Sequence, residues 1–168
     1  MKKKQQVFNN IDEDFRAIGI NALLIQELSV KRGTDHALDL LRMTSFDSDT
    51  GLDLQVCFAK LNNLLKDPAN REIVAEGNTS YLEQEDQVNI LRLLVQYSNF
   101  THAAYQTLDP SIISAYLFSI SEQLSLCFEA DADHEKVGII EEQMSLYLAA
   151  RIVLKNRMSL LGVITNTT

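Results

Sequence analysis

Apolar residues recur at steps of three and four along most of the chain. Phe15, Ile18, Ala22, Ile25 and Leu28 form one such series. This spacing places the side chains on one face of a helix, as in an amphipathic helix packed on a core. The same pattern predicts helices over about 14–30, 52–67, 82–108, 112–128 and 137–161, and no segment requires a strand. The sequence therefore predicts an all-α fold, a bundle of about five helices.

Residues that stop and start helices stand between these segments. The basic pair and glycine at 31–33 are typical of a helix end, and Gly162 has the same role after the last helix. The polar cluster at 47–51 predicts a turn that caps the second helix. Asp109 followed by Pro110 predicts a capped restart, because proline is favoured at the first helical position.

These boundaries divide the chain into four parts. Residues 1–17 form a basic N-terminal segment that includes the start of the first helix, and 18–67 form a helical segment. Residues 68–81 are polar and predict a surface loop, and 82–168 carry the remaining helices. Within the last part, the acidic stretch 129–135 is expected to link two helices.

Composition and charge narrow the possible functions. The 168 residues are 46% hydrophobic and 23% charged, which is typical of one globular domain. The net charge of −8 by itself argues against nucleic-acid binding. However, 13 acidic and two basic residues lie between Glu72 and Glu142, whereas three basic and no acidic residues follow from Gln143 onward. A local positive surface is therefore still available.

Motifs that carry catalytic or cofactor chemistry are missing from the sequence. It has no glycine-rich phosphate loop, no H-E-x-x-H and no G-x-S-x-G. Cys57 and Cys127 fall on apolar helix faces, so we expect small core residues rather than nucleophiles. The acidic residues at 131–135 predict a solvated loop, with a metal site as the alternative. No apolar run is long enough to predict a membrane span, and the residues alone indicate a helical binding or assembly domain.

Three blocks in the second half of the chain carry a family resemblance. They are Leu91-Arg92-Leu93-Leu94 with Leu108-Asp109-Pro110, Ala115-Tyr116-Leu117-Phe118 through Cys127-Phe128, and the run LYLAARIVLKNRMSLLGV at 146–163. In this order they resemble the C-terminal DALR anticodon-binding domain of arginyl-tRNA synthetases. The family typically closes with an Ala-Arg, a Val-Leu, an Asn-Gly and a Leu-Leu-Gly.

The resemblance continues upstream, where the family joins this domain to its catalytic fold. Similar segments are Ile18-Gly19-Ile20-Asn21-Ala22-Leu23, Lys31-Arg32-Gly33-Thr34-Asp35, and Asp49-Thr50-Gly51 followed by Leu54-Gln55. Asp53 and Val56 stand where the family has aromatics that help to pack against the anticodon loop. The signatures His-x-Gly-His and Lys-Met-Ser-Lys are missing, so the nucleotide-binding catalytic domain is expected outside these residues and the chain alone is expected to have no activity.

The resemblance implies an RNA-binding role for particular residues. Phe128 and Tyr116 match aromatic positions of the family that are expected to contact unstacked anticodon bases. Core packing is the alternative for Phe128, and it is the favoured role for Tyr116 because Ile112, Ile113 and Ile120 share its helix face. Arg151, Lys155 and Arg157 are expected to attract phosphates, and a solvated helix face is the alternative. Arg151 and Lys155 share a helix face because they are four residues apart.

The family resemblance implies a partner, a compartment and cofactors as well. The expected function is binding of the anticodon arm of an arginine-specific tRNA as part of an arginine–tRNA ligase. ATP and Mg²⁺ would act in the catalytic domain and not in this chain, and no membrane partner is expected. The cytoplasm is the expected compartment, with the mitochondrion as the alternative. The competing hypothesis is a helical scaffold, or a module that delivers tRNA to another protein.

Overall fold

The computed structural model describes residues 2–47, 49–66, 85–133 and 141–165. Within these ranges the chain forms helices and no strand. The helices are α1 (Lys2–Ser29), α2 (Leu40–Met43), α3 (Gly51–Lys66), α5 (Glu85–Val95), α6 (Tyr97–Thr107), α7 (Ser111–Asp133) and α8 (Glu141–Leu160). The predicted all-α bundle is confirmed. The predicted loop at 68–81 lies outside the described residues.

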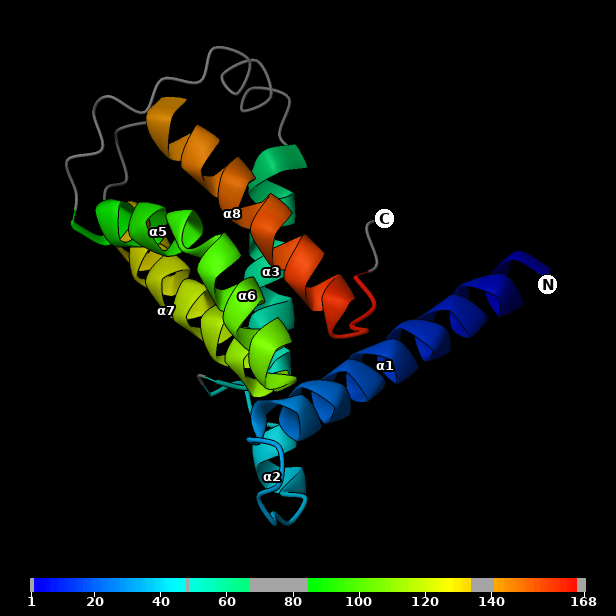
Figure 1. The fold of residues 1–168 in the computed structure, drawn as a ribbon. Coiled ribbons are helices and arrows are strands. Elements are labelled where there is room, and N and C mark those ends of the chain that lie inside the picture. Colours follow the sequence, from blue (N-terminus) through cyan, green and yellow to red (C-terminus); the bar gives the residue numbers. More distant parts are fainter. Residues whose placement is uncertain (1, 48, 67–84, 134–140, 166–168) are drawn as a thin grey trace.

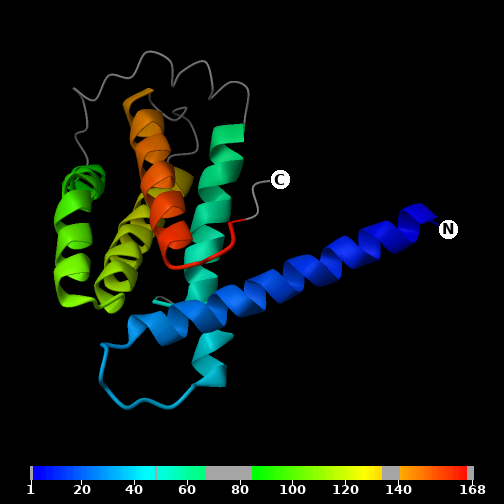
Figure 2. The same ribbon diagram turned by 45° about the vertical axis from the view of Figure 1, so that its right-hand side comes forward.

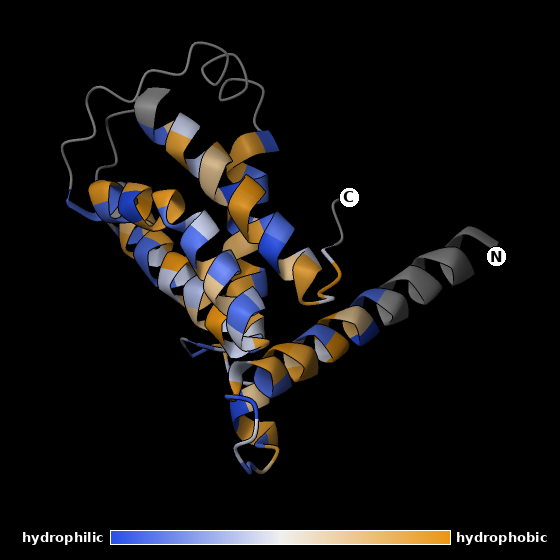
Figure 3. Ribbon diagram, viewed as in Figure 1, coloured by the Kyte–Doolittle hydropathy of each residue, from blue (hydrophilic) through white to orange (hydrophobic). Residues whose placement is uncertain are grey.

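Helix α7 is the centre of the bundle. It packs against α1, α3, α5, α6 and α8, and α1 crosses one end of α3 and then extends away from the bundle (Figures 1 and 2). The core consists of the apolar faces of these helices, and its fully buried members include Ile25, Leu54, Leu61, Ile90, Leu117, Ile120, Leu124 and Leu154. Figure 3 shows apolar and polar residues alternating along each helix of the bundle, which is the periodicity expected from the sequence.

The central position of α7 accounts for its apolar composition. By length and composition alone, its stretch Ser111–Glu129 would be sufficient to cross a membrane, with a mean hydropathy of 1.2. In the structure this helix is surrounded by neighbours, and Leu117, Ile120 and Leu124 have no exposed surface. A helix covered on most sides is expected to be apolar around most of its circumference.

The predicted caps and stops explain where several helices begin and end. The Thr50 hydroxyl accepts a hydrogen bond from the backbone N–H of Asp53 at 3.1 Å, which caps α3. The Asp109 carboxylate accepts the backbone N–H of Ser111 at 3.0 Å, which caps α7. After α8, Gly162 adopts a left-handed φ of 80°, and the backbone N–H of Val163 donates to the carbonyl of Met158 at 2.9 Å.

Three predicted helix boundaries were wrong. Helix α1 begins at Lys2 rather than near residue 14. The helix predicted over 82–108 is interrupted at Gln96, which ends α5 and precedes α6. The sequence has no proline or glycine at this interruption, and the helical spacing of apolar residues continues through it. The sequence pattern therefore predicted a single helix. Helix α7 extends to Asp133 and therefore includes five of the seven residues of the expected acidic link 129–135, whose last two lie outside the described residues.

Gly51 allows α1 and α3 to cross closely. A Cβ atom at this position would lie 2.7 Å from Cα of Ala22, a separation that side chains do not adopt. The crossing places Ile25 of α1 in the same core as Leu54 of α3. It also brings Asn21, next to Ala22, against the first turns of α3.

The cap of α7 predicts a dependence of stability on pH. The Ser111 hydroxyl, followed by the backbone N–H groups of Ser111 and Arg32, holds the pKa of Asp109 below its ordinary value of 3.8. A carboxylate with a lowered pKa stabilises the folded state above its unfolded pKa and loses that contribution as the pH falls through the folded value. We therefore expect Asp109→Asn to reduce the stability difference between about pH 7 and about pH 3, as measured by urea unfolding. Equal pH dependence in both proteins would contradict this role.

Candidate functional site

Tyr116 lies inside the bundle rather than on its surface. Its side chain has no exposed area, and its hydroxyl donates to the carbonyl of Leu93 at 3.0 Å. Its ring stacks on Phe100 with the centroids 4.5 Å apart. Burial raises the pKa of this tyrosine to about 12. The arrangement agrees with the core alternative for Tyr116, whose ring is not available to an RNA base in this structure.

Arg157 also points inward, between α8 and α6. Only 3% of its surface is exposed, and its guanidinium lies 3.6 Å from the centroid of the Tyr97 ring. It donates to the carbonyl of Tyr97 at 3.2 Å and to the hydroxyl of Thr101. The charge is therefore used to attach α8 to α6, and a phosphate cannot reach it in this arrangement.

Phe128 occupies an intermediate position near the end of α7. It is half-buried, and its ring is tilted against Tyr147 at 5.5 Å between centroids. The ammonium of Lys60 on α3 lies 5.7 Å from the Phe128 centroid. An aromatic ring with one partly open side and a cation beside it has the chemistry required to hold a base near a phosphate.

Arg151 and Lys155 share a different face of the bundle. Arg151 is half-buried and its Nε donates to the side-chain oxygen of Asn62 on α3, whereas Lys155 is exposed. Asn62 and Lys60 are two residues apart on α3, so they point in nearly opposite directions. Arg151 and Lys155 therefore lie on one face of α8, on the Asn62 side of α3, whereas Phe128 lies on the Lys60 side.

A groove lies on the Asn62 side of α3, between α1, α3 and the segment 161–165. It has a volume of about 210 Å³, and the side chains that line it include Ile18, Asn21, Gln55, Asn62, Met158 and Ile164. Arg151 borders the groove through its bond to Asn62. The helical periodicity of the sequence does not predict this groove. Its one sequence signal is Asn21, a polar residue on the otherwise apolar face of α1.

Asp53 and Val56 offer no aromatic surface, either to the groove or to the Phe128 position. Asp53 is half-buried and its carboxylate accepts a hydrogen bond from Ser121 at 3.1 Å. Burial, the largest influence, raises the pKa of Asp53 from its ordinary value. Val56 is 37% exposed and too small to stack on a base. Any RNA contact near the start of α3 must therefore use other groups.

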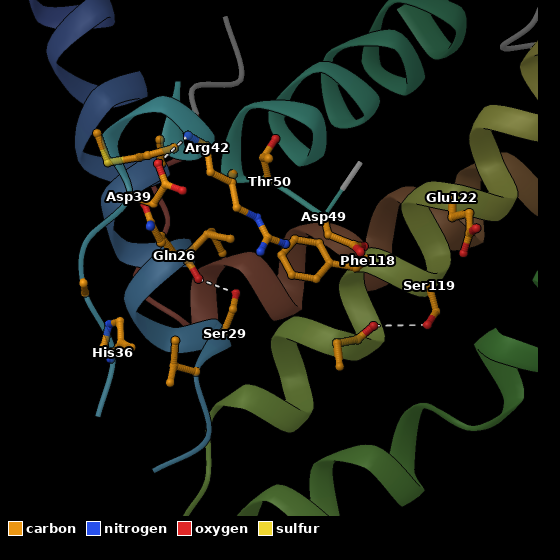
Figure 4. A pocket seen from close by; sticks show the side chains of 17 residues that line it. Gln26, Ser29, His36, Asp39, Arg42, Asp49, Thr50, Phe118, Ser119 and Glu122 are labelled. Atoms are coloured by element: carbon orange, nitrogen blue, oxygen red, sulfur yellow. Dashed lines mark hydrogen bonds between the residues drawn. The ribbon is translucent and has the colours of Figure 1, made fainter. Parts of the chain in front are cut away.

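A larger hollow of about 680 Å³ lies on the other side of α1, beside α2 and α7 (Figure 4). The Arg42 side chain enters it from α2, and Phe118 forms part of its wall. The carboxylates of Asp39, Asp49 and Glu122 also line this hollow. This excess of negative charge makes the hollow a poorer phosphate site than the face of Arg151.

The buried thiols and the acidic residues do not form a reactive centre in the described part of the chain. Burial raises the pKa of the Cys57 thiol to about 11, so the nucleophilic thiolate is rare near neutral pH. Cys127 has no exposed surface. Among the described side chains, no group of three or more His, Cys, Asp and Glu residues is placed to hold a metal ion. The acidic side chains at 131–135 lie outside the described set.

Comparison with known proteins adds a family to this geometry. Residues 54–167 match the model of the DALR anticodon binding domain. The chain is 30% identical to the mitochondrial arginine–tRNA ligase of Saccharomyces cerevisiae over 98% of its own length and 26% of that protein. It is 31% identical to the cytoplasmic arginine–tRNA ligase of the same yeast, covering 97% of this chain and 28% of the relative. The chain thus spans little more than a quarter of the length of these curated relatives.

A solved structure shares the fold. A crystal structure from Campylobacter jejuni, assigned as an arginyl-tRNA synthetase, superposes with a TM-score of 0.75 at 18% identity. The similarity covers 90% of this chain and 34% of that chain. The matching part of the larger protein therefore has the same helical arrangement.

Because Arg157 points inward and Lys155 points outward, removing the two side chains should lower the unfolding free energy by different amounts. Arg157→Ala removes a buried cation, its ring contact and two hydrogen bonds, and we expect a loss of about 2–4 kcal/mol of unfolding free energy. Lys155→Ala, at an exposed position of the same helix, is expected to change stability by less than about 0.5 kcal/mol. Urea unfolding monitored by circular dichroism measures both values. Equal effects of the two substitutions would refute the inward role of Arg157.

Proposed function

We propose, because this chain belongs to the DALR anticodon binding domain family, that it binds the anticodon arm of an arginine-specific tRNA within an arginine–tRNA ligase. The groove between α1, α3 and the segment 161–165 is the proposed site for anticodon nucleotides. The observation that carries this proposal is Arg151, which borders the groove through Asn62, with the exposed Lys155 one turn along the same face of α8.

The proposed contacts divide into two kinds. Arg151 and Lys155 neutralise phosphates, which positions the RNA without reading its sequence. The groove supplies the side-chain amide of Asn62 and apolar side chains for unstacked bases, and contacts of these kinds are how proteins generally read single-stranded RNA. Phe128 with Lys60 is a separate stacking position on the other side of α3. The anticodon arm would reach it only by extending around that helix.

In this proposal the aminoacylation reaction takes place in parts of a ligase outside this chain. The curated relatives are nearly four times as long as this chain, and aminoacylation with ATP and Mg²⁺ would take place in their additional residues. Among the described residues no group of three or more His, Cys, Asp and Glu side chains could hold a metal ion, and the sequence has no phosphate loop, so the proposal assigns both cofactors to those additional residues. In this proposal the contribution of this chain is RNA binding.

An exposed apolar surface gives the remainder of such a ligase a place to dock. Leu38, Leu40, Leu41 and Phe46 are 47–85% exposed around α2, at the end of the bundle away from α8 (Figure 3). Clusters of this kind commonly mark protein contacts. The same surface is the observation that favours the competing function, a scaffold or delivery module that binds another protein.

The compartment is part of the same proposal. The matching relatives include a cytoplasmic and a mitochondrial ligase from one yeast, with similar identities. We place this chain in the cytoplasm, and the mitochondrion is the alternative. Fractionation of cells that express the native protein decides between the two.

The cation pair predicts how RNA binding responds to salt. The double variant Arg151→Gln with Lys155→Gln removes two phosphate-binding charges, so binding of an arginine tRNA should weaken. The slope of log K against log salt should become shallower by up to about 1 for each charge removed. Fluorescence titrations with an arginine tRNA and an unrelated tRNA at several salt concentrations measure both quantities.

A matched control removes the same charge elsewhere. Arg42 on α2 and Arg92 on α5 are both exposed and lie away from the groove, so Arg42→Gln with Arg92→Gln should leave binding nearly unchanged. Equal weakening in both double variants would mean that only net charge matters. Failure of the unmodified chain to bind the arginine tRNA in preference to the unrelated one would favour the scaffold function.

Replacing Phe128 tests whether its ring stacks on an RNA base. Phe128→Leu keeps an apolar side chain but removes the ring, and we expect tRNA binding to weaken by about 1–3 kcal/mol. Phe15→Leu at a 68% exposed position of α1 is the control for loss of an aromatic ring. Unchanged affinity in Phe128→Leu, at unchanged stability in urea, would assign this ring to packing against Tyr147 alone.

A further inference from the structure

Asn21 joins three parts of the molecule that are distant in sequence. Its side chain is only 1% exposed, and it is a polar residue on a helix face that is otherwise apolar. Its side-chain nitrogen donates to the carbonyl of Ile164 at 2.8 Å and to the side-chain oxygen of Gln55 at 2.9 Å. Its side-chain oxygen accepts the backbone N–H of Ile164 at 2.9 Å. Every polar group of this buried amide therefore has a partner.

The bond to Ile164 resembles the pairing of two backbone segments. A side-chain amide has one donor and one acceptor side, and here both sides bind the same residue. This double contact fixes the position and the direction of the segment after Gly162. Gln55 is fixed in turn, because its nitrogen donates to the carbonyl of Gly51 at 2.9 Å.

Hydrophobic contacts hold the preceding part of the segment but not Ile164 itself. Leu161 and Val163 are buried in the core with 8% and 3% of their surfaces exposed. The Ile164 side chain is 52% exposed and lines the groove together with Thr165. Removing the Asn21 hydrogen bonds would therefore release the wall of the groove while the core packing of Leu161 and Val163 remains.

We propose that Asn21 is a positioning residue for RNA binding, because it holds the segment 161–165 as one wall of the anticodon groove. This inference rests on the proposed function. In it, the exposed Ile164 presents apolar surface to an unstacked base, and the opposite wall is formed by α3. Asn21 itself does not contact RNA, since its amide is buried and fully bonded within the protein.

The test separates the contact from simple folding. Asn21→Leu keeps the branching and the number of side-chain heavy atoms but cannot form these hydrogen bonds, and Asn63→Leu is its matched control at an exposed position of α3. Ile164→Pro removes the same N–H from the segment side and leaves α1 unaltered. Because it also removes the Ile164 side chain, it is compared with Ile164→Ala, which loses that side chain but keeps the N–H, and Ile164→Pro should bind more weakly than Ile164→Ala. Each variant is measured for urea stability, for affinity toward an arginine tRNA, and, except for Ile164→Pro, for hydrogen exchange of the Ile164 amide by NMR.

We expect Asn21→Leu and Ile164→Pro to bind the tRNA about tenfold more weakly than the unmodified chain, equivalent to about 1.4 kcal/mol. The Ile164 amide should exchange at least about tenfold faster in Asn21→Leu, because its acceptor is removed. Asn63→Leu should change neither quantity.

The possible failures are distinguishable. If the unmodified chain binds the tRNA and the two variants bind it equally well, the positioning role is overturned and the proposed function stands. Unaltered exchange of Ile164 in Asn21→Leu would also overturn it, since the segment would then be held without the amide. If the unmodified chain does not bind the tRNA, the proposed function fails and this inference fails with it.

Discussion

The close crossing of α1 and α3 at Gly51 is the constraint on which the rest of the structure depends. Any side chain at this position would meet Cα of Ala22 and force the two helices apart. Because the helices touch here, Asn21 reaches Gln55 one turn further along α3. The same amide then reaches Ile164, 143 residues away. The groove, its wall and its amide groups therefore follow from a single glycine.

Helix α8 directs one of its cations into the core and another to the surface. Arg157 and Lys155 are two residues apart, so they project from nearly opposite sides of the helix. One is buried against Tyr97, whereas the other is exposed. A count of basic residues in this helix treats them as equivalent, and only their position around the axis distinguishes them. Arg151 is intermediate, because its bond to Asn62 orients the guanidinium without burying it fully.

The features that could be predicted from the sequence are those set by residues close together along the chain. The all-α architecture, the Thr50 and Asp109 caps and the Gly162 stop depend on residues within one turn of each other. The interruption at Gln96 and the groove could not be predicted in this way. The interruption has no proline or glycine to mark it, and the groove depends on hydrogen bonds between α1 and the segment 161–165. The inward orientation of Arg157 depends on contact with the Tyr97 ring, and the helical periodicity of the sequence does not show that these two residues meet.

A net charge of −8 is compatible with RNA binding because electrostatic attraction is local. In physiological salt, charges farther apart than about 8–10 Å are largely screened, so an approaching phosphate responds to its nearest neighbours. Near the groove those neighbours are Asp14 in its lining and the cations Arg151 and Lys155 beside it, whereas Asp39, Asp49 and Glu122 gather in the hollow on the other side of α1. Under the proposed function, these carboxylates would oppose binding of RNA in other orientations. Removing the acidic residues would strengthen binding overall and weaken the preference for one face.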